Sequence, residues 1–235
     1  YPSSSPGQHH GAAAGRQVPY LVYGDSLTWE SADDIRARMG SQVVVRSYPG
    51  TAPCQWLGWL PADLAAYHPK VVGIVTAGNP CPGQTMGTLP YFLQYENDVA
   101  AMFSTITASG ARVVFFDAPP MLDPVRETFV AQFPVFAQAL AAEFPGVTVS
   151  DAIAAALSSD GAYTSTLPCL PTERVGRGCV GGRITVRTTV GLQAGLHLCP
   201  TGLPAAYPWK CPTYSSGEYR FAKAVASGLR AAWTG

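Results

Sequence analysis

The sequence contains little charge. Only 13% of its 235 residues are Asp, Glu, Lys or Arg, against roughly 25% in an average globular domain. Fifteen basic residues balance fifteen acidic ones, so no net field attracts a nucleic acid or an anionic membrane. No apolar run approaches the roughly 20 residues of a membrane-spanning helix. We therefore expect no nucleic-acid partner and no integral membrane segment.

The paired CxxC spacing of a zinc site is also missing, and no metal ligand set is evident. The six cysteines lie in loop-like sequence, several of them beside proline. An even number in loops fits three disulfides and an exported protein, secreted or in the cell envelope; buried free thiols in a cytosolic protein are the alternative. Of the several connectivities that six cysteines permit, sequence neighbourhood suggests Cys169–Cys179, Cys199–Cys211 and, by elimination, Cys54–Cys81.

The chain is long enough for one sizeable domain with a proper core. It begins at Tyr1 rather than Met, which predicts that a leader was removed, by a signal peptidase or by design. Residues 1–16 have low complexity and are expected to form a flexible lead-in. We assign residues 17–235 to a single domain.

Strand-like and helix-like segments alternate along the first two thirds of the chain. This order predicts an α/β fold, with a parallel sheet of about five strands, helices on both faces and ligands bound beyond the carboxyl ends of the strands. After about residue 159 the alternation stops, and a loop-rich excursion over 161–212 holds four of the six cysteines. A last helix is expected over 215–233. The expected strands are 20–24, 42–46, 71–76, 112–117 and 146–149, and the expected helices before the excursion are 27–39, 57–67, 89–109 and 124–143.

The most informative segment is the tetrapeptide 24–27, Gly-Asp-Ser-Leu, which follows the apolar stretch 19–23. It places Ser26 after a buried strand and at the start of a helix, where free N–H groups and the helix dipole favour negative charge. A nucleophile and the first donor of an oxyanion hole suit such a position. A helix-capping serine with no chemistry is the alternative. Asp25 is next to the candidate nucleophile, so its carboxylate cannot easily reach the side of a histidine base that faces away from the serine. We expect Asp25 to brace the turn.

A serine nucleophile needs a base, and histidine is the usual one. The chain has four histidines. His9 and His10 lie in the lead-in, and His68 ends a predicted helix, where a capping role fits it better. By elimination the candidate base is His197, which lies in the late loop close to Cys199.

Backbone or amide donors for an oxyanion must come from the loops that follow the neighbouring strands. Gly50 follows the strand at 42–46 and can offer a backbone N–H with no side chain in the way. Asn79 follows the strand at 71–76 and can offer its side-chain amide. Both are also ordinary turn residues, so each has a purely structural alternative.

Together these features resemble the SGNH, or GDSL, hydrolase family, whose four blocks centre on Ser, Gly, Asn and His. The matching residues are Ser26, Gly50, Asn79 and His197, in that order, and the similarity extends over roughly residues 18–232. The His-x-Cys-Pro-x-Gly stretch at 197–202 looks like secreted actinobacterial members. The resemblance implies a flavodoxin-like three-layer α/β/α sandwich and no cofactor. It also implies an acyl-enzyme mechanism: Ser26 attacks the ester, His197 takes its proton, and Ser26, Gly50 and Asn79 stabilise the oxyanion.

Two departures from the family pattern stand out. The third block usually reads Gly-x-Asn-Asp, but here it reads Ala-Gly-Asn-Pro. The family's triad acid usually stands three residues before the histidine, where this chain has Ala194, and no acid lies between Glu173 and Glu218. Some members orient the histidine through a backbone carbonyl, so a Ser–His dyad is our leading expectation. Glu173 or Asp160, folded back from the long loop, is the alternative acid.

Three functions are compatible with these residues. The first is an esterase or lipase that cleaves short to medium acyl chains from small esters, acylated carbohydrate or lipid. The second is an acyltransferase that passes the acyl group to a sugar hydroxyl. The third, motivated by Ala194 and Pro80, is a pseudoenzyme that binds an acyl or glycan ligand. Trp29, Trp56 and Trp59 could line an acyl or sugar pocket or simply pack in the core. The sequence is silent on the oligomeric state.

Overall fold

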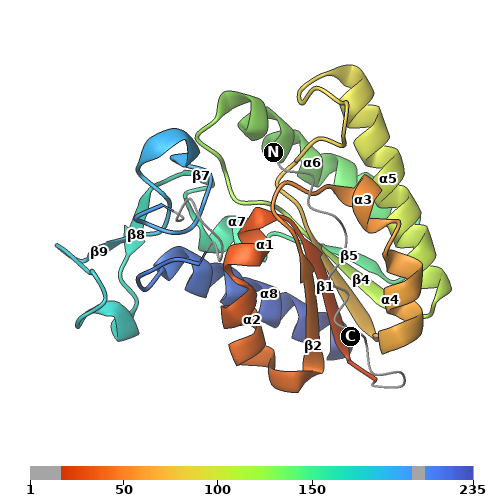
Figure 1. The fold of residues 1–235 in the computed structure, drawn as a ribbon, viewed down its shortest axis with the longest axis horizontal. Coiled ribbons are helices and arrows are strands. Elements are labelled where there is room, and N and C mark those ends of the chain that lie inside the picture. Colours follow the sequence, from red (N-terminus) through yellow and green to blue (C-terminus); the bar gives the residue numbers. More distant parts are fainter. Residues whose placement is uncertain (1–16, 203–209, 235) are drawn as a thin grey trace.

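A five-stranded parallel sheet forms the centre of the computed structural model, which describes residues 17–202 and 210–234 (Figure 1). The strand order is β2-β1-β3-β4-β5, and all neighbours run parallel. The expected strands are confirmed to within one residue at each end. Their bounds are β1 Tyr20–Gly24, β2 Val43–Ser47, β3 Val71–Val75, β4 Arg112–Phe116 and β5 Val147–Ser150.

Helices cover both faces of this sheet, which confirms the three-layer α/β/α prediction (Figure 1). One face carries α2 (Ala32–Met39), α7 (Ala152–Ala156) and α8 (Ser216–Thr234); α8 packs against α2, α7 and strands β3 and β4, and α2 contacts β2. The other face carries α3 (Pro53–Trp56), α4 (Leu60–Tyr67), α5 (Leu89–Ala108) and α6 (Pro124–Ala141). Strands β1 and β3 are buried along their whole length, as a parallel sheet between two helical layers requires.

The helix predicted over 27–39 is interrupted once. Ser31 has φ −87° and ψ 0°, outside the helical region, so the segment divides into α1 (Ser26–Glu30) and α2. A short 3₁₀ turn, η1 (Gly40–Gln42), then leads into β2. The five-residue α1 therefore stands alone at the carboxyl end of β1.

The late excursion lies beside the sheet, on the left in Figure 1. Its described residues, with those just before it, form two antiparallel pairs and two 3₁₀ turns: β6 (Ser158–Ser159) with β7 (Ala162–Tyr163), β8 (Thr166–Pro168) with β9 (Arg183–Thr185), η2 (Pro171–Glu173) and η3 (Gly191–Gln193). All three predicted disulfides are present: Cys54–Cys81, Cys169–Cys179 and Cys199–Cys211. The lead-in at 1–16 lies outside the described residues, so the division into lead-in and domain stays a prediction.

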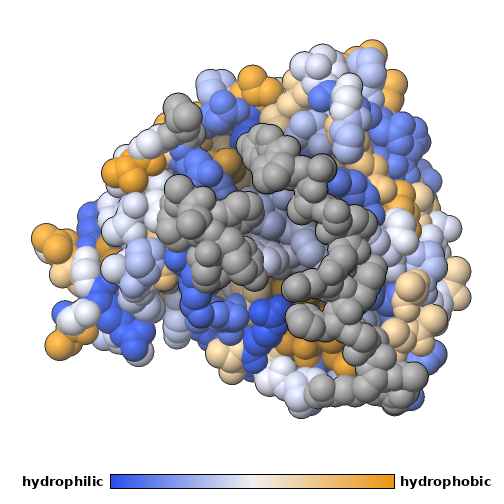
Figure 2. Space-filling model, in the orientation of Figure 1, coloured by the Kyte–Doolittle hydropathy of each residue, from blue (hydrophilic) through white to orange (hydrophobic). Residues whose placement is uncertain are grey.

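On the face shown in Figure 2, hydrophobic residues lie in small groups between hydrophilic ones. Among the described helices, none has both the length and the apolar character that crossing a membrane demands.

Candidate active site

The turn between β1 and α1 is built so tightly that its first residue must be glycine. A Cβ added to Gly24 would lie 2.0 Å from Thr28 Oγ1, one turn into α1. Asp25 is the N-cap, and its Oδ1 accepts from the Leu27 N–H at 3.1 Å. Ser26 is therefore the first residue of α1, at the helix N-terminus, as the sequence predicts.

Asp25 also ties this turn to the loop after β3. Its carboxylate is fully buried, and Oδ2 accepts from the Ala77 N–H at 2.8 Å and from Asn79 Nδ2 at 3.4 Å. Burial raises the pKa of Asp25, while the hydrogen bonds from the backbone N–H groups of Ala77 and Leu27 act in the opposite direction. The bracing role expected for Asp25 is confirmed, and it extends to a second loop.

The loops that carry Gly50 and Asn79 lie beside the Ser26 turn. Asn79 Nδ2 lies 3.3 Å from the carbonyl oxygen of Thr51, the residue after Gly50, and 3.4 Å from Asp25, the residue before Ser26. Gly50 has φ +73°, a left-handed conformation that favours glycine. Within the described part of the chain, the backbone N–H groups of Ser26 and Gly50 donate to no other group. The structure thus places Asn79 against the turn of Ser26 and the loop of Gly50, whose N–H groups are unpaired among the described residues.

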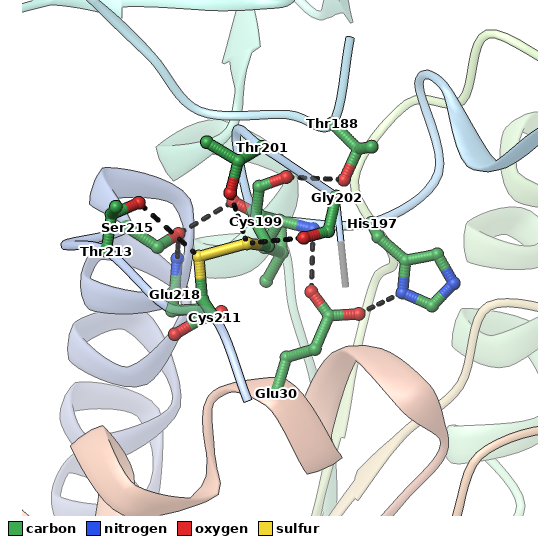
Figure 3. Close-up of a disulfide and its surroundings, with 11 residues drawn as sticks. Glu30, Thr188, His197, Cys199, Thr201, Gly202, Cys211, Thr213, Ser215 and Glu218 are labelled. Atoms are coloured by element: carbon green, nitrogen blue, oxygen red, sulfur yellow. Dashed lines mark hydrogen bonds and ion pairs between the residues drawn. A yellow bond between two sulfur atoms is a disulfide. The ribbon is translucent and has the colours of Figure 1, made fainter. Parts of the chain in front are cut away.

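His197 reaches the same region from the late excursion, where it faces Glu30 (Figure 3). Nδ1 of the imidazole hydrogen-bonds Glu30 Oε1, and Glu30 Oε2 accepts from the Leu198 N–H at 2.8 Å. The Glu30 side chain is fully buried, and that of His197 is 8% exposed. Because a carboxylate can only accept, Nδ1 carries the proton and Nε2 is left as the basic nitrogen. No hydrogen bond joins His197 to Ser26 in the part of the chain that the structure describes.

The expectation for the acid is therefore wrong. Neither a backbone carbonyl nor Glu173 nor Asp160 orients His197. Glu173 is held elsewhere: it accepts from the Leu170 N–H at 2.6 Å and the Tyr214 hydroxyl at 2.8 Å, while Asp160 is exposed. The acidic side chain that faces His197 lies 167 residues away in sequence.

A local signal for Glu30 was available in the sequence. Ser26 and Glu30 are four residues apart at the start of a predicted helix, and residues at that spacing lie on the same face. A search confined to the neighbourhood of the histidine misses such an acid. The serine and the carboxylate belong to the same turn of α1, while the histidine comes from a remote loop.

The loop that carries His197 is held on several sides. Arg187, fully buried, donates to the Leu196 carbonyl oxygen at 3.2 Å and to the Pro120 carbonyl oxygen at 3.1 Å. The Thr188 N–H donates to the His197 carbonyl oxygen at 2.8 Å. Two residues further on, Cys199 is joined to Cys211 (Figure 3). These contacts fix the backbone on both sides of the imidazole.

A second buried carboxyl, Glu218, lies next to the Cys199–Cys211 disulfide (Figure 3). Burial raises its pKa to about 8, and the nearby charges of Glu30 and Asp34 act in the same direction. Its Oε1 has no hydrogen-bond partner among the described residues. Because both sulfurs are in the disulfide, the cluster offers no thiolate ligand for a metal ion.

The three tryptophans near the site differ in role. Trp56 is fully buried and donates from Nε1 to Thr51 Oγ1 at 2.8 Å, so it is a core residue that supports the Gly50 loop. Trp29 and Trp59 are half-buried and contact Tyr48 from two directions, with ring centroids 6.3 and 4.9 Å away.

Solved structures, among them a candidate SGNH hydrolase, share this fold. The C-terminal catalytic domain of peptidoglycan O-acetyltransferase A from Streptococcus pneumoniae, solved with a methylsulfonyl adduct, is 12% identical with a TM-score of 0.57, covering 94% of this chain and 97% of that one. A candidate acylhydrolase from Bacteroides fragilis is 13% identical (TM-score 0.56; 94% and 92% covered). A candidate SGNH hydrolase from Slackia heliotrinireducens is 16% identical (TM-score 0.50; 91% and 100% covered). No family model and no curated protein sequence matches the chain.

Proposed function

We propose that the chain is a serine esterase of the SGNH type, with Ser26 as nucleophile and His197 as general base. The observation that carries the proposal is the Glu30–His197 pair. It joins a buried carboxylate on the helix of Ser26 to the imidazole of a remote loop. A buried acid that fixes the tautomer of a histidine is the arrangement that activates a serine hydroxyl.

The chemistry follows from the donors around Ser26. As Ser26 Oγ attacks an ester carbonyl, Nε2 of His197 takes its proton, and Glu30 stabilises the imidazolium that forms. The oxyanion is stabilised by the Ser26 and Gly50 N–H groups and by Asn79 Nδ2, which exchanges its 3.3 Å hydrogen bond with the Thr51 carbonyl oxygen for one to the oxyanion. The protonated imidazole then returns its proton to the leaving alkoxide, which departs as an alcohol. Water, activated by the same histidine, hydrolyses the acyl-enzyme.

The pseudoenzyme alternative was motivated by Ala194 and Pro80, and Glu30 supplies the acid that Ala194 lacks. Transfer to a sugar hydroxyl remains the second candidate. An O-acetyltransferase domain shares the fold over 97% of its length, and only the acceptor of the acyl group distinguishes the two reactions. Acyl esters of short to medium chain length, including acylated carbohydrate and lipid, are the proposed substrates.

The three disulfides support a location outside the reducing cytosol, secreted or in the cell envelope. Two of them bear on the site: Cys54–Cys81 joins the segment after Gly50 to the segment after Asn79, and Cys199–Cys211 follows His197. We therefore expect full activity only in the oxidised protein.

The test is hydrolysis of p-nitrophenyl acetate by the chain and by Ser26→Ala, together with mass spectrometry after treatment with a sulfonyl fluoride. We expect turnover that is lost in Ser26→Ala, and one sulfonyl adduct on Ser26. Equal rates in both proteins, with no adduct, would refute a serine acyl-enzyme. Adding a sugar acceptor separates the two candidates, because a transferase forms acyl-sugar at the expense of free acid.

A further inference from the structure

A residue outside the SGNH blocks, Arg126, helps to fix the orientation of the Asn79 amide. An asparagine side chain can present either its NH₂ donor or its carbonyl oxygen to a site, and its neighbours decide which. Asn79 Oδ1 accepts from Arg126 Nη1 at 3.3 Å, while Nδ2 faces the Thr51 carbonyl oxygen and Asp25 Oδ2. A reversed amide would place oxygen against two acceptors and NH₂ against a guanidinium.

Arg126 is itself well anchored. It lies in the first turn of α6, where its backbone N–H donates to the N-cap residue Asp123 at 2.8 Å. The same Nη1 that contacts Asn79 also donates to the Ala77 carbonyl oxygen at 3.3 Å. The guanidinium is half-buried, so its hydrogen bonds are less weakened by solvent than those of an exposed arginine.

From these contacts we infer that Arg126 is a positioning residue, which holds the Asn79 amide so that Nδ2 stabilises the oxyanion. This inference rests on the proposed function. An arginine has donors and no acceptor, so it can bond only the oxygen of the amide. A cationic donor on Oδ1 also polarises the amide and makes Nδ2–H a stronger donor. Arg126 thereby acts on the transition state through Asn79.

The kinetic test compares Arg126→Met, which keeps much of the aliphatic stem, with Arg126→Lys, Asn79→Ala and the Arg126→Met/Asn79→Ala double variant. Loss of one oxyanion donor typically costs about 10²–10³ in rate. We expect Arg126→Met to lower kcat about ten- to a hundredfold with KM unchanged, and Arg126→Lys to recover part of the loss. In the Asn79→Ala background, Arg126→Met should have no further effect. Arg112→Met is the matched control: Arg112 is exposed, donates to the Ala232 carbonyl oxygen and begins β4, so its activity should equal that of wild type.

Two kinetic results would overturn the inference. An equal loss in the wild-type and Asn79→Ala backgrounds would mean that Arg126 acts independently of Asn79. A raised KM with unchanged kcat would mean that it binds substrate.

The side-chain amide of Asn79 gives a readout that does not depend on turnover. Its NMR resonances, assigned with Asn79→Ala, should shift in Arg126→Met and exchange faster with water. Unchanged resonances would overturn the inference even if the chain showed no Ser26-dependent activity, an outcome that would separately refute the proposed esterase.

Discussion

Replacing Glu30 by glutamine should reverse the tautomer of His197. The Leu198 N–H donates to Glu30 Oε2 at 2.8 Å, so the glutamine oxygen must take that position, because an amide NH₂ there would face another donor. The NH₂ group then replaces Oε1 and points at Nδ1 of the imidazole. Nδ1 must become the acceptor, and the proton moves to Nε2. An imidazole that carries its proton on Nε2 cannot accept the proton of Ser26.

The expected size of the effect follows from this geometry. In a serine protease triad, the equivalent acid-to-amide change lowers kcat by about 10⁴, or ~5.5 kcal/mol of barrier at ~1.36 kcal/mol for each factor of ten. We expect a loss of that order for Glu30→Gln, because the backbone contact from Leu198 prevents the amide from turning over. Glu30→Asp, which keeps the charge but is one methylene shorter, should lose less.

The assay is p-nitrophenyl acetate hydrolysis at pH 7, with circular dichroism to show that each variant is folded. Glu218→Gln is the matched control, since it changes a buried carboxyl close to Glu30 that has no contact with His197 (Figure 3). Its rate should stay within a few-fold of wild type. Activity of Glu30→Gln within about tenfold of wild type, with a folded spectrum, would refute the tautomer argument.

Three further outcomes follow from the same site. Because the pKa of Glu218 is raised from 4.5 to about 8, the folded protein keeps a proton that the unfolded chain releases, and stability falls as pH rises from about 4.5 to about 8. The free energy of unfolding of Glu218→Gln should therefore exceed that of wild type by ~3 kcal/mol at pH 7, which is 2.5 pH units above 4.5 at ~1.36 kcal/mol each. Urea unfolding at pH 5 and pH 8 tests this, and an equal gain in free energy at both pH values contradicts it. Changing Cys199 and Cys211 together to serine should lower the free energy of unfolding by about 3 kcal/mol and the esterase rate more than tenfold. Removing the other disulfide of the excursion, Cys169–Cys179, should leave the esterase rate unchanged. Gly24→Ala, whose Cβ would collide with Thr28, should lower the free energy of unfolding by about 1–3 kcal/mol, as measured by urea denaturation; an unchanged midpoint would show that the turn relaxes without cost.

The features that the sequence predicted correctly are mostly local. The strands follow from short apolar runs between turn residues, and the disulfides from cysteines that are close in sequence or left over. Ser26, Gly50 and Asn79 could be assigned to one region because the carboxyl ends of neighbouring parallel strands share one edge of the sheet.

The features that were missed depend on tertiary contacts. Nothing near His197 in sequence indicates that Glu30 faces it, because the contact exists only once the long excursion has folded back over α1. The link from Arg126 to Asn79 is of the same kind, since α6 carries no other part of the site. For Glu30 the spacing from Ser26 was the one hint in the sequence, whereas for Arg126 only its contact with Asn79 in space gives it a role.

The site is divided unevenly along the chain. The proposed nucleophile and its proposed acid share one five-residue helix, so their relative geometry is set by helical rise rather than by packing between distant segments. The histidine alone comes from the late excursion. A recombination event that exchanged the excursion would therefore bring in a new base and a new rim for the substrate, while the nucleophile would keep its acid. With such a layout, substrate preference can change while the relative placement of the serine and the carboxylate is kept.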